Sequence, residues 1–143
     1  MDRFVVGFAF TQSDKRTSPK VLLVEKNRPE WQKGRLNGIG GKIEGNETPQ
    51  QAMTREAFEE AALTIDWIYR GILKGTNLDG RPFECHLFYA YSSTVFDYSQ
   101  KEDEPLCLYD TKSLESLNIV DSLNFLIPFG LSKDRIPFMT LTY

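Results

Sequence analysis

Three glutamates, Glu56, Glu59 and Glu60, are spaced so that one face of a helix would present all three carboxylates. Like charges at this spacing repel by roughly a few tenths of a kcal/mol per pair, so a compensating positive charge is expected. Carboxylate oxygens are ligands of hard divalent cations such as Mg²⁺ or Mn²⁺, and Mg²⁺ completes its octahedron with water and substrate phosphate oxygens. The cluster therefore points to phosphate chemistry. The alternative is an ordinary solvated helix face.

The helix that carries these acids is predicted to begin near residue 49. Thr48 can cap its N-terminus, Pro49 suits the first helical position, and Gln51 completes a capping box with Thr48. The periodicity predicts an apolar face opposite the glutamates. The residues of that predicted apolar face are Met53, Ala57, Phe58 and Ala61. Just upstream, the glycine-rich run NGIGGK of residues 37–42 allows the main chain to approach a ligand closely.

The spacing of these residues resembles the signature of the Nudix hydrolases, G-x5-E-x7-R-E-U-x-E-E-x-G-U with U an apolar residue. Here Gly41, five residues, Glu47 and seven residues precede REAFEEAAL at residues 55–63. Ala62 stands where the signature has glycine, a residue that eases the end of a helix. With this substitution the signature does not define the backbone geometry at the end of the helix, and the acidic positions are unchanged.

The resemblance implies a role for each signature residue. It implies that cations are held by the three glutamates and by the backbone carbonyl of Gly40, with Glu56 also acting as general base. Arg55 would orient the acidic cluster and pair with Glu47. Gly41 and Lys42 would lie close to the phosphates of a substrate.

An acidic loop, Glu102-Asp103-Glu104, precedes a short predicted strand. It reads either as a solvated turn or as the source of a further metal ligand or of the general base, since family members take the base from the helix or from such a loop. Alignment around Cys107 favours Asp103 as the metal ligand.

Within the family, the run KGRLNGIGGK, the acidic loop and DSLNFLIPF are most similar to MutT-type triphosphatases that act on oxidised purine nucleotides. This similarity implies that Asn37 hydrogen-bonds the base, that Asp121 lies in the base pocket and that Lys26 approaches the nucleotide. Asn118 replaces a stacking tryptophan and Val120 replaces the first of two aspartates. Asn37 as a turn residue and Asp121 as a helix N-cap are the alternatives.

The remaining elements predict an α/β fold with a mixed sheet between helical layers, and the resemblance implies the same α/β/α sandwich. Residues 4–10 and 21–26 are predicted to form a hairpin, and His86 in a later strand is given no catalytic role. Further predicted elements are strands at 63–75, 81–93 and 136–143, a turn at 77–80, and a short helix at 121–132 interrupted at Pro128.

Length and composition limit the possible classes of protein. The 143 residues predict one domain spanning residues 1–143. A net charge of −3 without a long basic run argues against binding to a nucleic-acid duplex, and no apolar run approaches the ~20 residues that span a bilayer. Cys85 and Cys107 are isolated and no signal peptide is visible, which predicts a reduced, cytoplasmic compartment. A monomer and a homodimer are both compatible.

Together these features predict a Mg²⁺-dependent hydrolase that cleaves nucleoside triphosphates to a nucleoside monophosphate and pyrophosphate, with Mn²⁺ as a possible substitute. A second reading is hydrolysis of another nucleoside diphosphate linked to X, such as ADP-ribose, a dinucleotide or capped RNA. A third is a non-catalytic nucleotide-binding module. The presence of all three glutamates favours the enzymatic readings.

Overall fold

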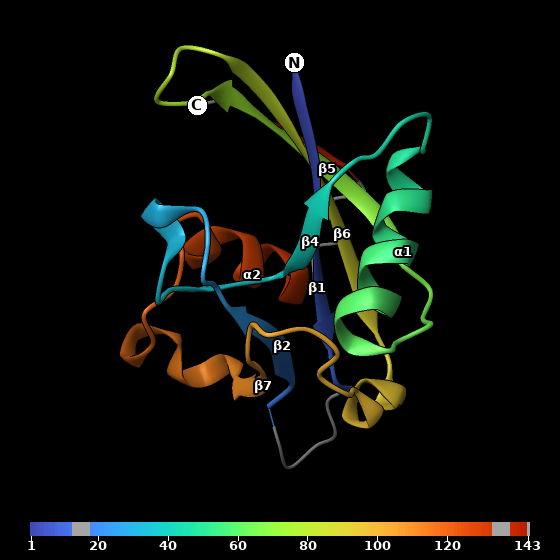
Figure 1. Ribbon diagram of the computed structural model, residues 1–143. Coiled ribbons are helices and arrows are strands. Elements are labelled where there is room, and N and C mark those ends of the chain that lie inside the picture. The colour runs from blue at the N-terminus through green and yellow to red at the C-terminus, as the bar shows by residue number, and fades with distance from the viewer. Residues whose placement is uncertain (13–17, 133–137, 143) are drawn as a thin grey trace.

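The computed structural model describes residues 1–12, 18–132 and 138–142 of the chain. These residues form a mixed sheet in the order β3-β2-β1-β6-β5-β8, with β4 also paired to β1 and β7 to β2 (Figure 1). The strands are β1 (Asp2–Phe10), β2 (Lys20–Glu25), β3 (Leu36–Asn37), β4 (Ile39–Lys42), β5 (Ile68–Thr76), β6 (Pro82–Tyr91), β7 (Leu106–Asp110) and β8 (Met139–Thr142). The helices are α1 (Pro49–Ala61) and α2 (Leu123–Leu131), with short 3-10 turns at Glu30–Gln32, Ser93–Asp97 and Thr111–Ser116.

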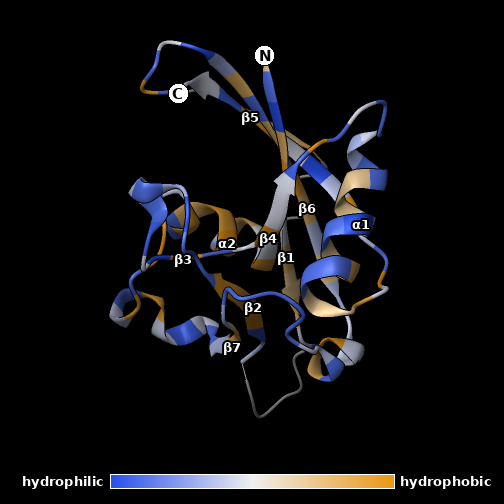
Figure 2. Ribbon diagram, in the orientation of Figure 1, coloured by the Kyte–Doolittle hydropathy of each residue, from blue (hydrophilic) through white to orange (hydrophobic). Residues whose placement is uncertain are grey.

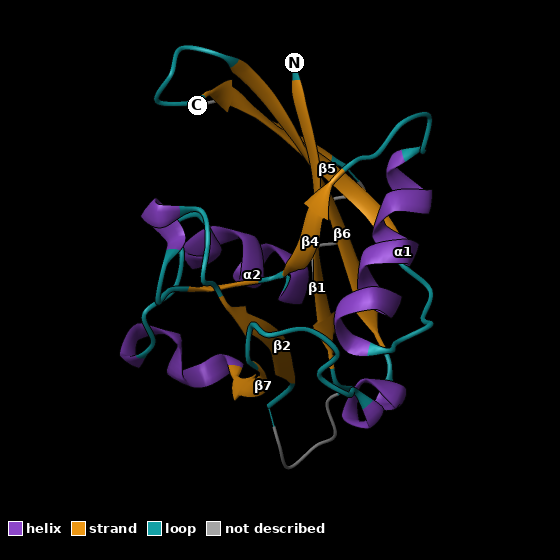
Figure 3. Ribbon diagram, viewed as in Figure 1, coloured by secondary structure: helices purple, strands orange, loops and turns teal. Residues whose placement is uncertain are grey.

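The two helices cover opposite faces of the sheet (Figures 1 and 3). Successive side chains of a strand point to opposite faces. In β1, Val5 and Ala9 therefore join the core beneath α1, whereas Val6, Phe8 and Phe10 join the core beneath α2. The apolar strands at the centre of the molecule are visible in Figure 2. The predicted α/β/α sandwich with a mixed sheet is confirmed.

Strand β1 lies at the centre of the sheet, between β2 and β6. It also pairs with β4, which contains Gly40 and Gly41 of the glycine run. It runs parallel to β6 over the register from Asp2↔Phe83 to Phe10↔Tyr91. It runs antiparallel to β4, where Val6 faces Gly40. The predicted hairpin is confirmed by the antiparallel pairing of β1 with β2, although residues 13–17 of its turn lie outside the described residues.

Three element predictions need correction or completion. Residues 63–67 precede the strand, which begins at Ile68, because Leu63 and Trp67 are buried against the core as the chain leaves α1. Pro128 does not interrupt α2, since Leu126 and Ile127 are buried against the sheet, and this packing outweighs the hydrogen bond that a helical proline removes. The predicted C-terminal strand is observed as β8, while residues 136, 137 and 143 lie outside the described residues.

The lone histidine and both cysteines lie on strands, His86 and Cys85 on β6 and Cys107 on β7. His86 is 5% exposed, and its Nδ1 lies 2.5 Å from the hydroxyl oxygen of Tyr69 on the neighbouring strand. Both cysteines are free, and burial raises the pKa of the Cys85 thiol to about 12. No helix among the described residues is both long and apolar enough to cross a membrane.

Candidate active site

Two of the three glutamates of α1 lie on the face that packs toward the sheet. Glu56 is 9% exposed and Glu60 is 7% exposed, beside the fully buried Met53 and Ala57. Positions 53, 56, 57 and 60 follow the i, i+3, i+4, i+7 spacing of a core-facing stripe. The predicted apolar face is confirmed for Met53, Ala57 and Ala61, which are fully buried. It was wrong for Phe58, which is 62% exposed, and Glu56 and Glu60 occupy places where apolar side chains are expected. This rules out a solvated surface face for Glu56 and Glu60.

The start of α1 is fixed as the sequence predicts. Thr48 has extended backbone geometry and its side chain accepts a hydrogen bond from the Gln51 N–H, while the Gln51 side chain accepts one from the Thr48 N–H. The helix ends at Ala62, which adopts the left-handed conformation (φ 55°, ψ 31°) that favours glycine. Ala62 thus keeps the exit geometry that a glycine would provide, at a steric cost of about 1 kcal/mol.

The glycines of β4 are required by close contacts. A Cβ at Gly40 would lie 2.0 Å from the carbonyl oxygen of Val5, its neighbour in β1. A Cβ at Gly41 would lie 2.5 Å from Oε1 of Glu56. Strand β4 can therefore pass between β1 and the carboxylate of Glu56 only because these two residues lack side chains.

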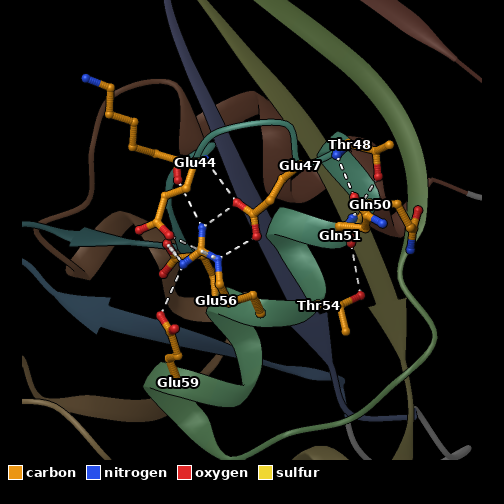
Figure 4. Close-up of polar contacts among 10 residues, drawn as sticks. Glu44, Glu47, Thr48, Gln50, Gln51, Thr54, Glu56 and Glu59 are labelled. Atoms are coloured by element: carbon orange, nitrogen blue, oxygen red, sulfur yellow. Dashed lines mark hydrogen bonds and ion pairs between the residues drawn. The ribbon is translucent and has the colours of Figure 1, made fainter.

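Arg55 connects the acidic side chains (Figure 4). Its Nε and Nη2 donate to the two oxygens of Glu47 at 2.7 and 3.0 Å, which is a bidentate pair. Its Nη1 donates to Glu56 Oε1 at 2.9 Å and to Glu59 Oε2 at 3.1 Å. Nη2 also donates to the carbonyl oxygen of Lys42 at 3.1 Å, which ties the guanidinium to the end of β4.

The electrostatics of this group follow from those contacts. The Arg55 side chain and the N–H of Glu44 both donate to the Glu47 carboxylate and lower its pKa. The same hydrogen bond from Arg55 to Glu47 is the main cause that raises the pKa of the guanidinium. Glu47 and Arg55 are therefore both fully charged at neutral pH.

Glu60 is the least compensated carboxylate of the group. Within the described residues its Oε2 is buried and has no hydrogen-bond partner. Burial, followed by the negative charge of Glu56, raises the pKa of Glu60 to about 8, although Lys26 and the Gly40 N–H oppose the shift. Burial likewise raises the pKa of Glu56 against the opposing effect of Arg55. A buried, unpaired carboxylate is costly unless a proton or a cation accompanies it.

Glu102 of the acidic loop adds its negative charge to the electrostatic environment of Glu56 and Glu60. Glu102 is the loop acid whose charge raises the pKa values of both Glu56 and Glu60. Asp103 is directed elsewhere: Arg28 Nη2 lies 3.6 Å from its Oδ1, and the Asn27 side chain donates to its Oδ2 at 3.4 Å. Sequence alone identified the loop but could not tell that Asp103 and Glu104 pair with residues 26–28.

Of the residues predicted to bind the nucleotide, Asn37 lies in β3 at one end of the strand order and Asp121 follows a segment bonded to β3. Asn37 donates from its side chain to Gln32 Oε1 at 3.0 Å and accepts from the Gly38 N–H at 2.8 Å. Asp121 is exposed and follows a segment that pairs with β3, where the Val120 N–H donates to the Leu36 carbonyl. The N-cap of α2 is Ser122, which excludes the alternative capping role for Asp121.

The two predicted lysines lie in different surroundings. Lys42 is largely exposed, and its Nζ lies 3.9 Å from Asp2 Oδ1. Lys26 is mostly buried and donates to Glu104 Oε1 at 3.1 Å. The structure therefore brings Lys26 to the acidic loop, a contact that sequence reasoning missed because Lys26 and Glu104 are far apart in the chain.

The donors of this site suit a hard divalent cation. They are carboxylate and carbonyl oxygens, and the buried Glu60 oxygen lacks a partner among the described residues. In this conformation Arg55 engages Glu56 and Glu59, and the described residues contain no group of three His, Cys, Asp or Glu side chains already arranged around a metal position. Arg55 occupies one oxygen of Glu56 and one of Glu59, so coordination would use the second oxygen of each carboxylate or replace the hydrogen bond to Arg55.

The fold is a mixed sheet between two helices, and the site is an arginine-linked acidic cluster beside a glycine-rich strand. Together they define a class of domain whose carboxylates could bind phosphate groups through a divalent cation. Residues 1–121 match the NUDIX domain family. The chain therefore belongs to the Nudix family. Nudix hydrolases generally use divalent metal ions.

Similar proteins include an oxidized purine nucleoside triphosphate hydrolase from Danio rerio, 43% identical over 51 residues. That match covers 36% of this chain and spans about a third, 32%, of the relative. A MutT protein from Bacillus halodurans has a similar structure, with a TM-score of 0.71 at 19% identity over 100% of this chain and 90% of the other. The NUDIX domain of Shewanella oneidensis NrtR, solved with ADP ribose, gives 0.69 at 18% identity over 91% and 88%.

Proposed function

We propose that this protein hydrolyses nucleoside triphosphates to a nucleoside monophosphate and pyrophosphate, with Mg²⁺ as its cofactor and Mn²⁺ as a substitute. The observation that carries the proposal is the buried Glu60 carboxylate, which lies beside Glu56 and has an oxygen without a partner among the described residues. Burying such a group costs roughly several kcal/mol, which a stable fold tolerates when the group serves a ligand.

The proposed metal ligands are Glu56, Glu59, Glu60 and the carbonyl of Gly40, joined by an acid from the loop. We assign Glu102 in place of the sequence-based choice, Asp103, because the charge of Glu102 acts on Glu56 and Glu60 whereas Asp103 is directed toward Arg28. A bound divalent cation would neutralise charge on the phosphate oxygens and lower the pKa of the attacking water.

The chain's own groups supply orientation and proton transfer. Glu56 is the proposed general base: Arg55 donates to its Oε1, which leaves Oε2 for a water proton, and its raised pKa makes it a better proton acceptor. Glu47 holds Arg55 in place through the bidentate pair. We assign phosphate contact to Lys42, which is exposed at the end of β4, and close approach of the main chain to Gly41 beside it.

Base recognition is assigned to Asn37 and Asp121, with Lys26 at the nucleotide's inner edge. At the two positions that depart from the oxidised-purine enzymes, the structure offers no substitute contact: the Asn118 side chain donates to the Gly34 carbonyl at 3.2 Å, and Val120 is buried in the core beneath α2. We therefore expect weaker preference for oxidised over unmodified purines than two aspartates and a stacking tryptophan would give.

Two comparisons support different substrates. The likeness to the Danio rerio oxidized purine nucleoside triphosphate hydrolase favours triphosphates. The likeness to a NUDIX domain solved with ADP ribose supports a second candidate, a nucleoside diphosphate linked to X, bound with or without turnover. Both candidates place a diphosphate at the same acids.

The test is a substrate panel with Mg²⁺, containing canonical and oxidised nucleoside triphosphates, ADP-ribose, dinucleotides and capped RNA, with products resolved chromatographically. Monophosphate plus pyrophosphate is the expected result. Cleavage confined to ADP-ribose or another X-linked substrate would support the second candidate, and tight binding without any product would support a binding module. Glu59→Gln and Glu60→Gln should each lower turnover by orders of magnitude, while Glu115→Gln, on an exposed turn, serves as the matched control.

We further infer that residues 1–143 form one domain, because β8 pairs with β5 within the same sheet that contains β1. Cytoplasmic location is proposed from the two free cysteines. Sedimentation would separate the two proposed states, monomer and homodimer.

A further inference from the structure

The acidic loop, Glu102-Asp103-Glu104, lies within residues 99–106. This segment connects two parts of the proposed site through backbone hydrogen bonds. At its start, the Ser99 N–H donates to the Ala61 carbonyl at 2.9 Å and the Lys101 N–H donates to the Glu60 carbonyl at 3.1 Å. At its end, the Glu25 N–H donates to the Pro105 carbonyl at 2.8 Å. The loop is therefore attached to the last turn of α1 on one side and to the end of β2 on the other.

Glu104 anchors the second attachment. Its side chain is 6% exposed, and its two oxygens accept from Lys26 Nζ at 3.1 Å and from the Asn27 N–H at 2.5 Å. A buried carboxylate with two charge-assisted or backbone donors has a well-defined position. Asp103 adds only exposed contacts with Arg28 and with the Asn27 side chain, of the kind that contribute little.

Gln100 braces the interior of the loop. Its side-chain amide donates to the Glu102 carbonyl at 3.1 Å, and its Oε1 accepts from the Leu106 N–H at 3.1 Å. The backbone around Glu102 is therefore held by the two hydrogen bonds of the Gln100 side chain and by the contacts of Glu104. None of these side-chain contacts of Gln100 and Glu104 involves a carboxylate of α1.

We propose that Glu104 is a positioning residue, which fixes the acidic loop on Lys26 and Asn27 and so holds Glu102, the residue after Lys101, beside the end of the helix that carries Glu56 and Glu60. The inference rests on the proposed function in one respect, namely that these three acids bind a cation. Both oxygens of Glu104 are engaged by Lys26 and the Asn27 N–H, so Glu104 is not assigned as a metal ligand. Because Lys26 also belongs to the predicted nucleotide-binding segment, the same ion pair links that segment to the metal-binding loop.

The test is a double-mutant cycle on Mn²⁺ binding, measured by titration calorimetry without nucleotide. Glu102→Gln and Glu104→Gln should each weaken binding about tenfold or more, the usual effect of losing an orienting partner. If Glu104 acts through Glu102, the double variant should bind within about twofold of Glu102→Gln alone, because coupled residues are not additive. Multiplied effects in the double variant, or wild-type affinity in either single variant, would overturn the proposal.

Two further measurements separate positioning from general stability. In the metal-free protein, Glu104→Gln should speed amide hydrogen exchange at Lys101 and Leu106 while exchange in β1 stays slow. Gln100→Ala removes the loop brace without leaving a buried charge, and it should show the same lack of additivity with Glu102→Gln if Glu104→Gln folds poorly. Glu115→Gln is the control.

Turnover is measured separately, so that the two proposals fail in different ways. Coupled Mn²⁺ binding without hydrolysis of any nucleotide would reject the proposed function and leave the positioning role intact. Normal hydrolysis with independent effects of Glu102 and Glu104 would reject the positioning role alone.

Discussion

Protonation of Glu60 makes a quantitative prediction about metal binding. Burial beside Glu56 raises the pKa of Glu60 to about 8 in the metal-free protein. At that pKa about 99% of the carboxyls are protonated at pH 6 and about half at pH 8. A cation binds the carboxylate, so binding should release close to one proton at pH 6 and about half a proton at pH 8. For the same reason the dissociation constant should fall about 50-fold between these pH values.

Calorimetry in two buffers of different ionisation enthalpy counts these protons directly. The heat of Mg²⁺ or Mn²⁺ binding should differ between the buffers at pH 6, in proportion to the protons released. Glu60→Gln should remove most of this difference, and the remainder reports Glu56, whose pKa burial also raises. Equal heats in both buffers at pH 6 would refute the reasoning, because Glu60 would then be ionised despite its burial.

Three further predictions follow from the same contacts. Because the pKa of Glu60 is raised in the folded protein, its stabilising effect is fully present below the unfolded pKa of 4.5 and is lost as the pH rises. The metal-free protein should therefore lose up to roughly 5 kcal/mol of stability as the pH rises to 8, and Glu60→Gln should flatten this pH dependence in thermal melts. In Gly41→Ala the new Cβ would lie 2.5 Å from Glu56 Oε1, so calorimetry should show metal binding weakened about 10- to 100-fold with little change in circular dichroism. Ala62→Gly should raise the midpoint of thermal unfolding by up to about 3 °C, since it removes up to about 1 kcal/mol of strain from the left-handed backbone of Ala62. A lower midpoint would show that the greater entropy of glycine in the unfolded chain outweighs the relieved strain.

The sequence was sufficient for features that depend on local spacing. The capping box at Thr48 and Gln51, the start of α1 and the β1–β2 hairpin are confirmed because each depends on residues that are near neighbours in the chain or alternate regularly. The family resemblance rested on spacing of the same kind. It located Glu47 and Arg55, which the structure joins by two hydrogen bonds.

Features that depend on tertiary contacts could not be predicted in the same way. Assigning Phe58 to the buried face followed hydrophobicity, whereas the sheet in fact packs over Glu56 and Glu60. The period of the helix alone, read from Met53, would have placed both acids in the buried stripe. The choice of Asp103 over Glu102 depended on the direction of a loop that is fixed by Lys26 and other residues distant in sequence. No local pattern carries that information.

The pairing of Glu47 with Arg55 has a consequence for how the site could exchange ligands. Arg55 makes two hydrogen bonds to Glu47 and one each to Glu56, Glu59 and the Lys42 carbonyl. If Glu56 and Glu59 turn toward a cation, Arg55 keeps three of its five hydrogen bonds, all to residues that precede α1. The guanidinium would then stay in place, with its charge still close to the carboxylates it had released. An acid eight residues before the arginine therefore holds the arginine while the acids that follow it change partners. Glu47→Gln should consequently impair metal binding even though Glu47 is not itself a proposed ligand.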